Sequence, residues 1–313
     1  MEPRGQELIT LYKHNYRIPA AAEITEEMIR NHWELEKNLV KNLWESTPEN
    51  RWEVFEKSYT TLYSDLEWLN NFSVENTQHL NQYETWLGIL VSPPKKIYEV
   101  GSGKGEMIEY FAKCGFECKA TEITKERGSK HITDSSNNLS WGNSDGVHLD
   151  QFEPTDFYDF VVSNQVIEHF HPNDLNTHFQ SVYQILNQQG SYIFTTPHCH
   201  TGPHDLSVVF GYDYPQCMHL KEYTYHELHQ SLKLAGFKSI YSAVPGKLRK
   251  FLSKLGLGNE EKIRKVGIFY FHLMLIMENL LLVIKSKKQR RSLSKFLRKI
   301  YLFADNIFLV AQK

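Results

Sequence analysis

Cysteines are few in this 313-residue sequence, and glycine-rich or proline-rich linkers and internal repeats are absent from it. The four cysteines, Cys114, Cys118, Cys199 and Cys217, are unevenly spaced and include no CxxC pair. This usage is typical of a reducing compartment, so we expect a cytoplasmic protein. Residues 1–10 contain charges and no apolar run, and no secretory signal is expected there. The 41% hydrophobic and 13% aromatic content excludes a disordered chain.

Net charge is also small, at −2, but it is unevenly distributed. Residues 246–313 hold 16 Lys and Arg against 4 Asp and Glu, a local charge of +12. The preceding 245 residues hold 19 basic and 33 acidic residues, a charge of −14. An acidic body with a basic C-terminal region can indicate an anionic partner.

Residues 1–74 are predicted to form a helical extension. Thr25, followed by two acids, is a suitable N-cap for an amphipathic helix that runs to about Trp44. A second helix follows Pro48 and has an aromatic stripe on one side. Such a stripe favours packing on the next domain over a lid that gates a substrate.

From Pro94 the pattern changes to alternating strands and helices, which predicts an α/β fold. We expect a core over residues 75–245, a helical insertion over 246–305 and a last strand over 306–313. Within the core, the expected strands are 96–100, 117–123, 157–166, 191–196 and 238–244, and the expected helices are 104–114, 172–187 and 223–235.

The segment from Glu99 to Gly105, with sequence EVGSGKG, stands at a strand end and leads into a helix. Glycines at alternate positions let the chain turn sharply and let a ligand approach the backbone. The spacing is GxGxG, whereas a dinucleotide fingerprint requires GxGxxG, so NAD is disfavoured. Glu122 follows the last glycine by 17 residues, at the end of the next strand, where a carboxylate can accept both ribose hydroxyls.

With these features the chain resembles the class I S-adenosylmethionine-dependent methyltransferases, specifically the small-molecule (type 11 or type 23-like) group. The resemblance rests first on the glycine loop and on Glu122. It continues in the segment 157–169, which ends in Glu168-His169, and in the segments 186–198, 219–224 and 235–237. It implies a Rossmann-like seven-stranded sheet and S-adenosyl-L-methionine as cofactor.

The resemblance also implies roles for residues. Glu99 would face the methionyl end, Glu122 the ribose, and Asn164 would close over the methionyl group. The family often has an acid directly after the glycine near the adenine, where this chain has Asn143, and Asp145 is the nearest acid. The expected cofactor-binding residues are Glu99, Gly101, Ser102, Gly103, Gly105, Glu122, Ile123, Asn143, Ser144 and Asn164.

Methyl transfer mainly requires alignment of the nucleophile with the methyl group, and a hydroxyl acceptor also needs a base. A neutral histidine suits that role. The candidates are His169, His198, His200, His204 and His219. We favour His198, directly after the fifth strand, and expect His169 to close a turn or position the acceptor.

The run from His198 to Asp205 also invites a metal hypothesis, because three histidines and a carboxylate are metal-ligand chemistry. No second ligand cluster is apparent, and methyl transfer requires no metal. We therefore expect a substrate loop and no metal.

Residues 266–284 form an apolar run flanked by Lys and Arg, long enough to span a bilayer. A single crossing would put the last strand on the other side of the membrane from the sheet. Basic residues flank the run at both ends, so they give no inside–outside bias. Three interpretations remain, in decreasing order: a helix buried on the domain or in a homodimer, a surface helix facing lipid, and a true span. Peripheral membrane contact through 246–305 is consistent with the second.

The leading functional hypothesis is O-methylation of a small-molecule, glycan or lipid-like acceptor. The alternatives are C- or N-methylation of a small metabolite, or a non-catalytic module that retains the fold. Nucleic-acid methylation is disfavoured, because the sequence has no Asp/Asn-Pro-Pro-Tyr/Phe motif for an extruded base.

Overall fold

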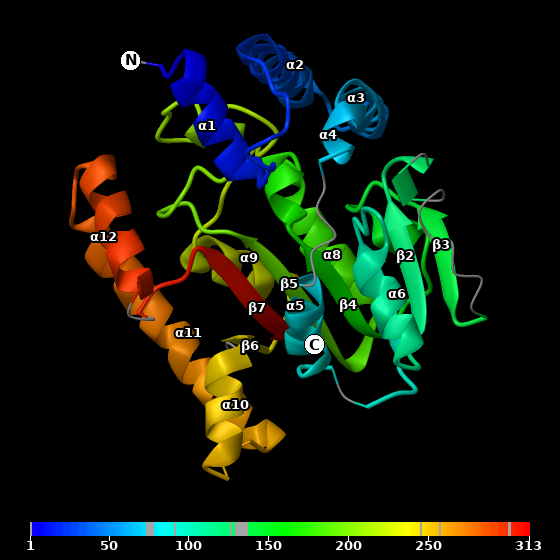
Figure 1. Cartoon of the computed structure of the whole chain (residues 1–313). Helices are drawn as coiled ribbons and strands as arrows, with labels where there is room; N and C mark the ends of the chain where they lie inside the picture. The colour runs from blue at the N-terminus through cyan, green and yellow to red at the C-terminus, as the bar shows by residue number, and fades with distance from the viewer. Residues whose placement is uncertain are drawn as a thin grey trace.

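The computed structural model describes residues 2–72, 78–90, 92–125, 127–128, 137–244, 246–256, 258–299 and 302–313. A seven-stranded sheet with the order β3-β2-β1-β4-β5-β7-β6 forms its centre, with helices on both faces (Figure 1). Strands β1 to β5 pair in parallel, and β7 pairs antiparallel with both β5 and β6. This confirms the predicted α/β fold. The strands are β1 Lys96–Val100, β2 Glu117–Glu122, β3 Leu139–Asn143, β4 Tyr158–Asn164, β5 Leu186–Pro197, β6 Ser239–Ser242 and β7 Asn306–Gln312.

Alternating side chains of the strands fill two separate cores. In β1, Tyr98 and Val100 face one core together with helices α8 (Leu175–Ile185) and α9 (Tyr225–Ala235). Ile97 faces the other core, with helices α5 (Gln78–Leu87) and α6 (Glu106–Lys113). Strands buried on both faces read as near-continuous apolar runs, which is why most of them are visible in the sequence. β3 is only partly buried at the sheet edge and has no such run, so the sequence did not predict it.

Helices α1 (Gly5–Tyr16), α2 (Glu26–Glu45), α3 (Arg51–Asp65) and α4 (Glu67–Asn70) form the extension at one end of the sheet (Figure 1). Thr25 caps α2 as predicted, because its side chain accepts a hydrogen bond from the Met28 amide. The ring of Trp33 stacks on Phe210 at 4.3 Å between centroids. The extension therefore packs on the loop that follows β5. Helix α1, whose bounds within the predicted extension were not expected from the sequence, joins the same core.

The insertion before β7 consists of α10 (Gly246–Lys254), α11 (Glu260–Leu282) and α12 (Lys287–Lys299). Within the described residues, α11 is the one helix that by length and composition is able to cross a membrane. It packs along β6, where a methyl group at Gly267 would lie 2.5 Å from the Ser242 carbonyl oxygen. Because β7 returns to pair with β5 and β6, as the expected last strand does, α11 lies against the domain.

A buried carboxylate fastens α11 to the core. Glu278 is 1% exposed, and its Oε1 lies 2.6 Å from His198 Nε2. The same carboxylate accepts hydrogen bonds from the backbone amides of Tyr225 and His226 and from the His226 ring. These amides are the first of α9, where a negative charge is favoured by the helix dipole.

Replacing Glu278 by Gln tests this connection. The substitution leaves donors on His198 and at the start of α9 facing an amide, and we expect the free energy of unfolding to fall by about 3 kcal/mol at pH 7. Burial raises the pKa of Glu278, but its histidine and amide hydrogen bonds outweigh this and lower the pKa below the usual 4.5. The wild-type advantage should therefore be complete above pH 4.5 and disappear as the pH falls through the lowered pKa.

Urea unfolding at pH 7 and at acidic pH measures the difference between the two proteins. Glu261→Gln, an exposed change on the same helix, is the control and should be near neutral. Equal stability of Glu278→Gln and wild type at pH 7 would contradict the role given to Glu278.

Candidate functional site

The glycine loop joins β1 to α6 at the carboxyl ends of the parallel strands. Gly101, Gly103 and Gly105 have φ angles of 65°, 58° and 78°, in the left-handed region that favours glycine. A side chain at Gly101 would also meet Val166 at 2.8 Å. The amide of Ser102 donates to the Thr121 carbonyl of β2, which holds the loop against the neighbouring strand.

A cavity of about 700 Å³ lies over this loop, within the usual range for small-molecule sites. One side is formed by the strand ends, and the other by the helical extension and the loop after β5. Most of the predicted cofactor residues line the first side: Glu99, Gly101, Ser102, Gly103, Glu122, Ile123, Ser144 and Asn164. Gly105 and Asn143, also predicted, are not among the lining residues.

Two buried polar atoms beside the loop have no hydrogen-bond partner among the described residues, Glu99 Oε2 and Ser102 Oγ. Burial and the neighbouring Glu122 charge raise the pKa of Glu99 well above its usual value. A ligand that brings positive charge and hydrogen-bond donors would satisfy both atoms. The methionyl end of S-adenosylmethionine, with its ammonium and sulfonium, fits this chemistry.

Glu122 ends β2 beside the loop. Its Oε2 accepts a hydrogen bond from the Gly103 amide at 2.8 Å, and its Oε1 accepts one from the Ile123 amide at 3.0 Å. Each carboxylate oxygen can accept a further bond, so two ribose hydroxyls could donate here. Binding of a ribose by Glu122 stays a prediction.

Asn143 does not face the cavity as the sequence had suggested. Its amide nitrogen donates to the carbonyls of Glu122 and Ile123, at 2.9 and 2.8 Å, and so ties β3 to the end of β2. The acid that lines the cavity is Asp145, whose Oδ1 accepts from two following amides. Sequence spacing alone could not show which of Asn143 and Asp145 lines the cavity, because the chain bends after β3 and a side chain two positions further along can reach it.

We call the side of the cavity opposite the glycine loop the acceptor side. It is built from segments far apart in the sequence. It contains the aromatic side chains of the extension and a group of acids and histidines. The principal residues are Tyr16, Glu36, Phe55, Tyr59, Tyr63, His169, His204, Asp205 and His219. The extension therefore both packs on the domain and lines the cavity.

Glu222 connects two of these histidines. Its Oε1 lies 3.0 Å from His219 Nδ1, and its Oε2 lies 3.2 Å from His204 Nδ1. Burial lowers the pKa of His219, but the Glu222 hydrogen bond and the charges of Glu168, Glu222 and Asp205 raise it above its usual value overall. Burial raises the pKa of Glu222, yet its histidine partners lower it to about 2, so it remains a carboxylate.

His169 lines the cavity, and its ring makes edge contacts with the rings of Tyr59 and His219. Its Nδ1 lies 2.9 Å from the Met218 carbonyl, so this nitrogen carries the proton. Burial, followed by the charge of His219, lowers the pKa of His169 to about 3. This imidazole is neutral and a weak base, which suits positioning.

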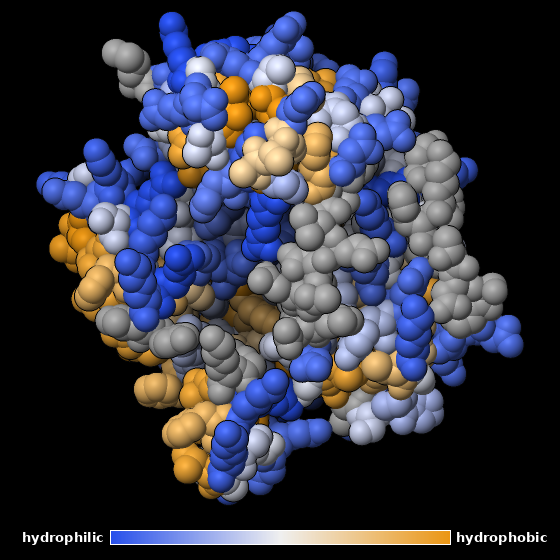
Figure 2. Space-filling view, viewed as in Figure 1, coloured by the Kyte–Doolittle hydropathy of each residue, from blue (hydrophilic) through white to orange (hydrophobic). Residues whose placement is uncertain are grey.

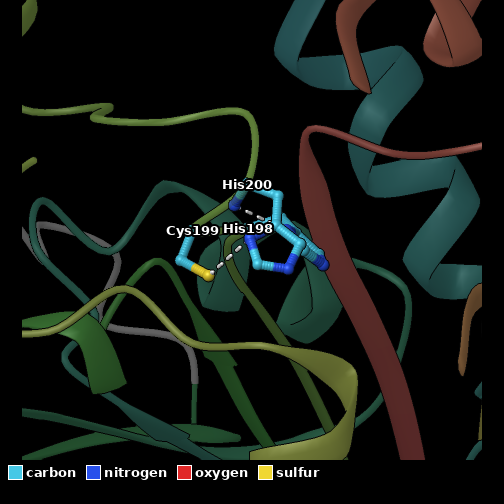
Figure 3. A group of neighbouring side chains, drawn as sticks. All are labelled: His198, Cys199 and His200. Atoms are coloured by element: carbon cyan, nitrogen blue, oxygen red, sulfur yellow. Dashed lines mark hydrogen bonds between the residues drawn. The ribbon is translucent and has the colours of Figure 1, made fainter. Parts of the chain in front are cut away.

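His198 was the favoured base, and its place in the structure does not support that role. It is fully buried, it is absent from the lining of the cavity, and its Nε2 faces Glu278 of the insertion. Its Nδ1 accepts from the His200 amide at 3.0 Å (Figure 3). The sequence placed His198 at a strand end and predicted the insertion, but it could not show that the insertion packs against His198 through Glu278.

His198, Cys199 and His200 bring three metal-type ligand atoms within 4.8 Å of one another (Figure 3). Both ring nitrogens of His198 are engaged in hydrogen bonds, and Cys199 Sγ lies 3.4 Å from His200 Nδ1. Burial raises the pKa of the Cys199 thiol, which disfavours the thiolate that binds a metal. The group fits a hydrogen-bonded turn better than a metal site.

Comparison with known proteins agrees with this geometry. A family model described as a methyltransferase domain matches residues 78–242, more than half of the chain. No curated protein gives a significant match.

Solved structures with similar backbones include three methyltransferases. A SAM-dependent methyltransferase from Archaeoglobus fulgidus is 17% identical, with 82% of this chain and 99% of that chain covered and a TM-score of 0.49. 1,6-Didemethyltoxoflavin-N1-methyltransferase from Burkholderia thailandensis is 13% identical, with 86% and 91% covered and a TM-score of 0.49. Phosphoethanolamine N-methyltransferase 2 from Haemonchus contortus is 15% identical, with 74% and 52% covered and a TM-score of 0.47.

Glu122→Ala tests the cofactor side of the cavity. Losing two charge-assisted hydrogen bonds to the ribose should weaken S-adenosylmethionine binding about 100-fold in isothermal titration calorimetry. Glu117→Ala, at the exposed start of the same strand, is the matched control and should bind like wild type. Unchanged affinity in Glu122→Ala, with the thermal melt intact, would remove Glu122 from the cofactor site.

Proposed function

Because this chain belongs to the methyltransferase-domain family, as a class I S-adenosylmethionine-dependent methyltransferase, we propose that it methylates a hydroxyl oxygen of a polar small-molecule, glycan or lipid-like acceptor. The observation that carries this proposal is the Glu222–His219 pair on the acceptor side of the cavity. A carboxylate that orients a histidine is the arrangement of a general base.

S-adenosylmethionine supplies an electrophilic methyl group and leaves as a neutral thioether. A neutral hydroxyl is a weak nucleophile and must lose its proton as its oxygen bonds to the methyl carbon. His219 Nδ1 donates a hydrogen bond to Glu222. The other ring nitrogen, Nε2, therefore keeps a free lone pair that can accept the hydroxyl proton. The charge of Glu222 then stabilises the imidazolium that forms.

The charge of the cavity also supports a hydroxyl acceptor. Glu36 and Asp205 line the acceptor side of the cavity. Carboxylates repel an anionic acceptor but accept hydrogen bonds from hydroxyl groups. His204, held by the same Glu222, is a second polar contact for such an acceptor.

N-methylation of a small amine is the second candidate. Tyr16 and Tyr59 line the cavity together with Glu36 and Asp205, and this combination of aromatic rings and carboxylates suits a protonated amine. Mass spectrometry of the product distinguishes the two candidates by locating the added methyl group on oxygen or nitrogen.

His219→Gln should lower kcat by at least about 100-fold, the usual contribution of a general base, while S-adenosylmethionine affinity stays at the wild-type level. Release of S-adenosylhomocysteine during incubation with cell extract and with a panel of hydroxylated acceptors is the measurement. His14→Gln, on the exposed side of α1, should retain wild-type turnover. A wild type that binds the cofactor but methylates nothing in the extract or panel would instead indicate a binding module.

Glu222→Gln should change the pH profile as well as the rate. The Glu222 hydrogen bond and charge raise the pKa of His219, and the base is active only when neutral. Removing the charge lowers that pKa, so the acidic limb of kcat/KM should move to lower pH while the plateau falls. An unshifted acidic limb would show that His219 is not the titrating base.

A further inference from the structure

Helix α11 is apolar on two opposite sides. One stripe, which includes Phe271, Met274 and Leu281, packs into the core with β6 and α9. The opposite stripe is exposed, with Phe269 at 70%, Ile276 at 55%, Leu280 at 58% and Val283 at 78%. The spacings of seven, four and three residues place these four side chains on one face of the helix. A helix that is apolar all round is normally covered, in a core or by lipid.

The neighbouring helices extend this exposed surface. Phe251 and Leu255 on and just after α10 are each 57% exposed, as is Phe296 on α12. Figure 2 shows the hydrophobic side chains as a band along the outer edge of α11 and α12 that continues over α10. Contiguous apolar surface of this kind marks an interaction site, whereas single exposed side chains are ordinary.

Positive charge flanks the band at both ends of α11. Lys262, Arg264 and Lys265 precede its apolar run, and Lys285 and Lys288 follow it, all of them exposed. The acids of the insertion offset this charge only in part. Glu278 is buried, Glu261 pairs with Lys265, and Asp305 pairs with Arg298. Among the described residues of the insertion, Glu260 is the one exposed acid that forms no ion pair.

We propose that helices α10–α12 dock the protein on the surface of an anionic lipid bilayer, with their outward side chains in the interface and their Lys and Arg on the lipid headgroups. Amphipathic helices with aromatic and aliphatic residues beside basic clusters bind in this way. Each basic residue near an anionic surface adds about a fivefold gain in affinity. The docking is peripheral, because the inner stripe of α11 is packed on the sheet and β7 returns to it.

A bilayer fits this surface better than a second copy of the chain. A homodimer through α11 would bring the basic clusters of two insertions together, and like charges oppose such contact. The body of the protein has a net charge of −14, so it would not bind the anionic surface on its own. The surface and the cavity are also connected, because Glu278 of α11 holds His198 at the start of the loop that carries His204 and His219 to the cavity. The docking proposal does not depend on the O-methylation proposal.

Vesicle co-sedimentation of the full chain tests the proposal. The wild type should bind phosphatidylcholine vesicles that contain phosphatidylserine, should not bind pure phosphatidylcholine vesicles, and should be released by high salt. Ile276→Asn with Leu280→Asn should weaken binding at least about tenfold, because two apolar side chains no longer enter the interface. Lys285→Gln with Lys288→Gln should weaken it about 30-fold.

Each double variant has a matched control elsewhere on the surface. Leu11→Asn with Phe152→Asn changes two other exposed apolar residues, and Lys41→Gln with Lys57→Gln removes two other exposed charges. Both should bind like wild type. All variants change exposed side chains, and unchanged S-adenosylmethionine affinity shows that they are folded.

Three results would overturn the proposal. One is no binding of the wild type to either vesicle. Another is equal loss of binding in the variants and their controls. The third is a wild-type dimer in sedimentation equilibrium that becomes monomeric in Ile276→Asn with Leu280→Asn, since the band would then be a protein interface.

Discussion

Parallel pairing of β3, β2, β1, β4 and β5 is the constraint on which the site depends. It brings the carboxyl ends of these strands to one edge, so the loops that follow them meet there. Glu99, Glu122 and Asn164 stand at or beside three of these strand ends and line one cavity, although the sequence separates them by up to 65 residues. The same edge is then covered by the helical extension, which turns an open crevice into a pocket.

Several carboxyl groups are buried in this structure, and the number of hydrogen-bond donors around each one determines whether its pKa is lowered or raised. Glu278 and Glu222 are surrounded by donors, which keeps their pKa low and makes them anchors for histidines. Burial raises the pKa of Glu168 to about 7 and that of Glu99 well above its usual value. A buried carboxyl without enough donors remains sensitive to the charge that a ligand brings, which suits a cofactor-facing position.

The insertion and the cavity are not independent parts. Glu278 fixes the N-terminus of α9 and the His198 turn in a single hydrogen-bonded cluster. That turn begins the loop whose later residues reach the cavity and also pack on Trp33 of the extension. The loop after β5 thus contacts Trp33 near the beginning of the chain and Glu278 near its end.

Local periodicity and the residues at strand ends were enough to predict the α/β class, most strands, the glycine loop and the position of Glu122 at the end of a strand beside that loop. Only the tertiary structure showed that Asp145 lines the cavity in place of Asn143, that His198 is buried against Glu278, and that Glu222 orients His219. These outcomes rest on contacts between elements up to 80 residues apart. No local pattern records such contacts, because their geometry is set by how the helices and loops pack on the sheet.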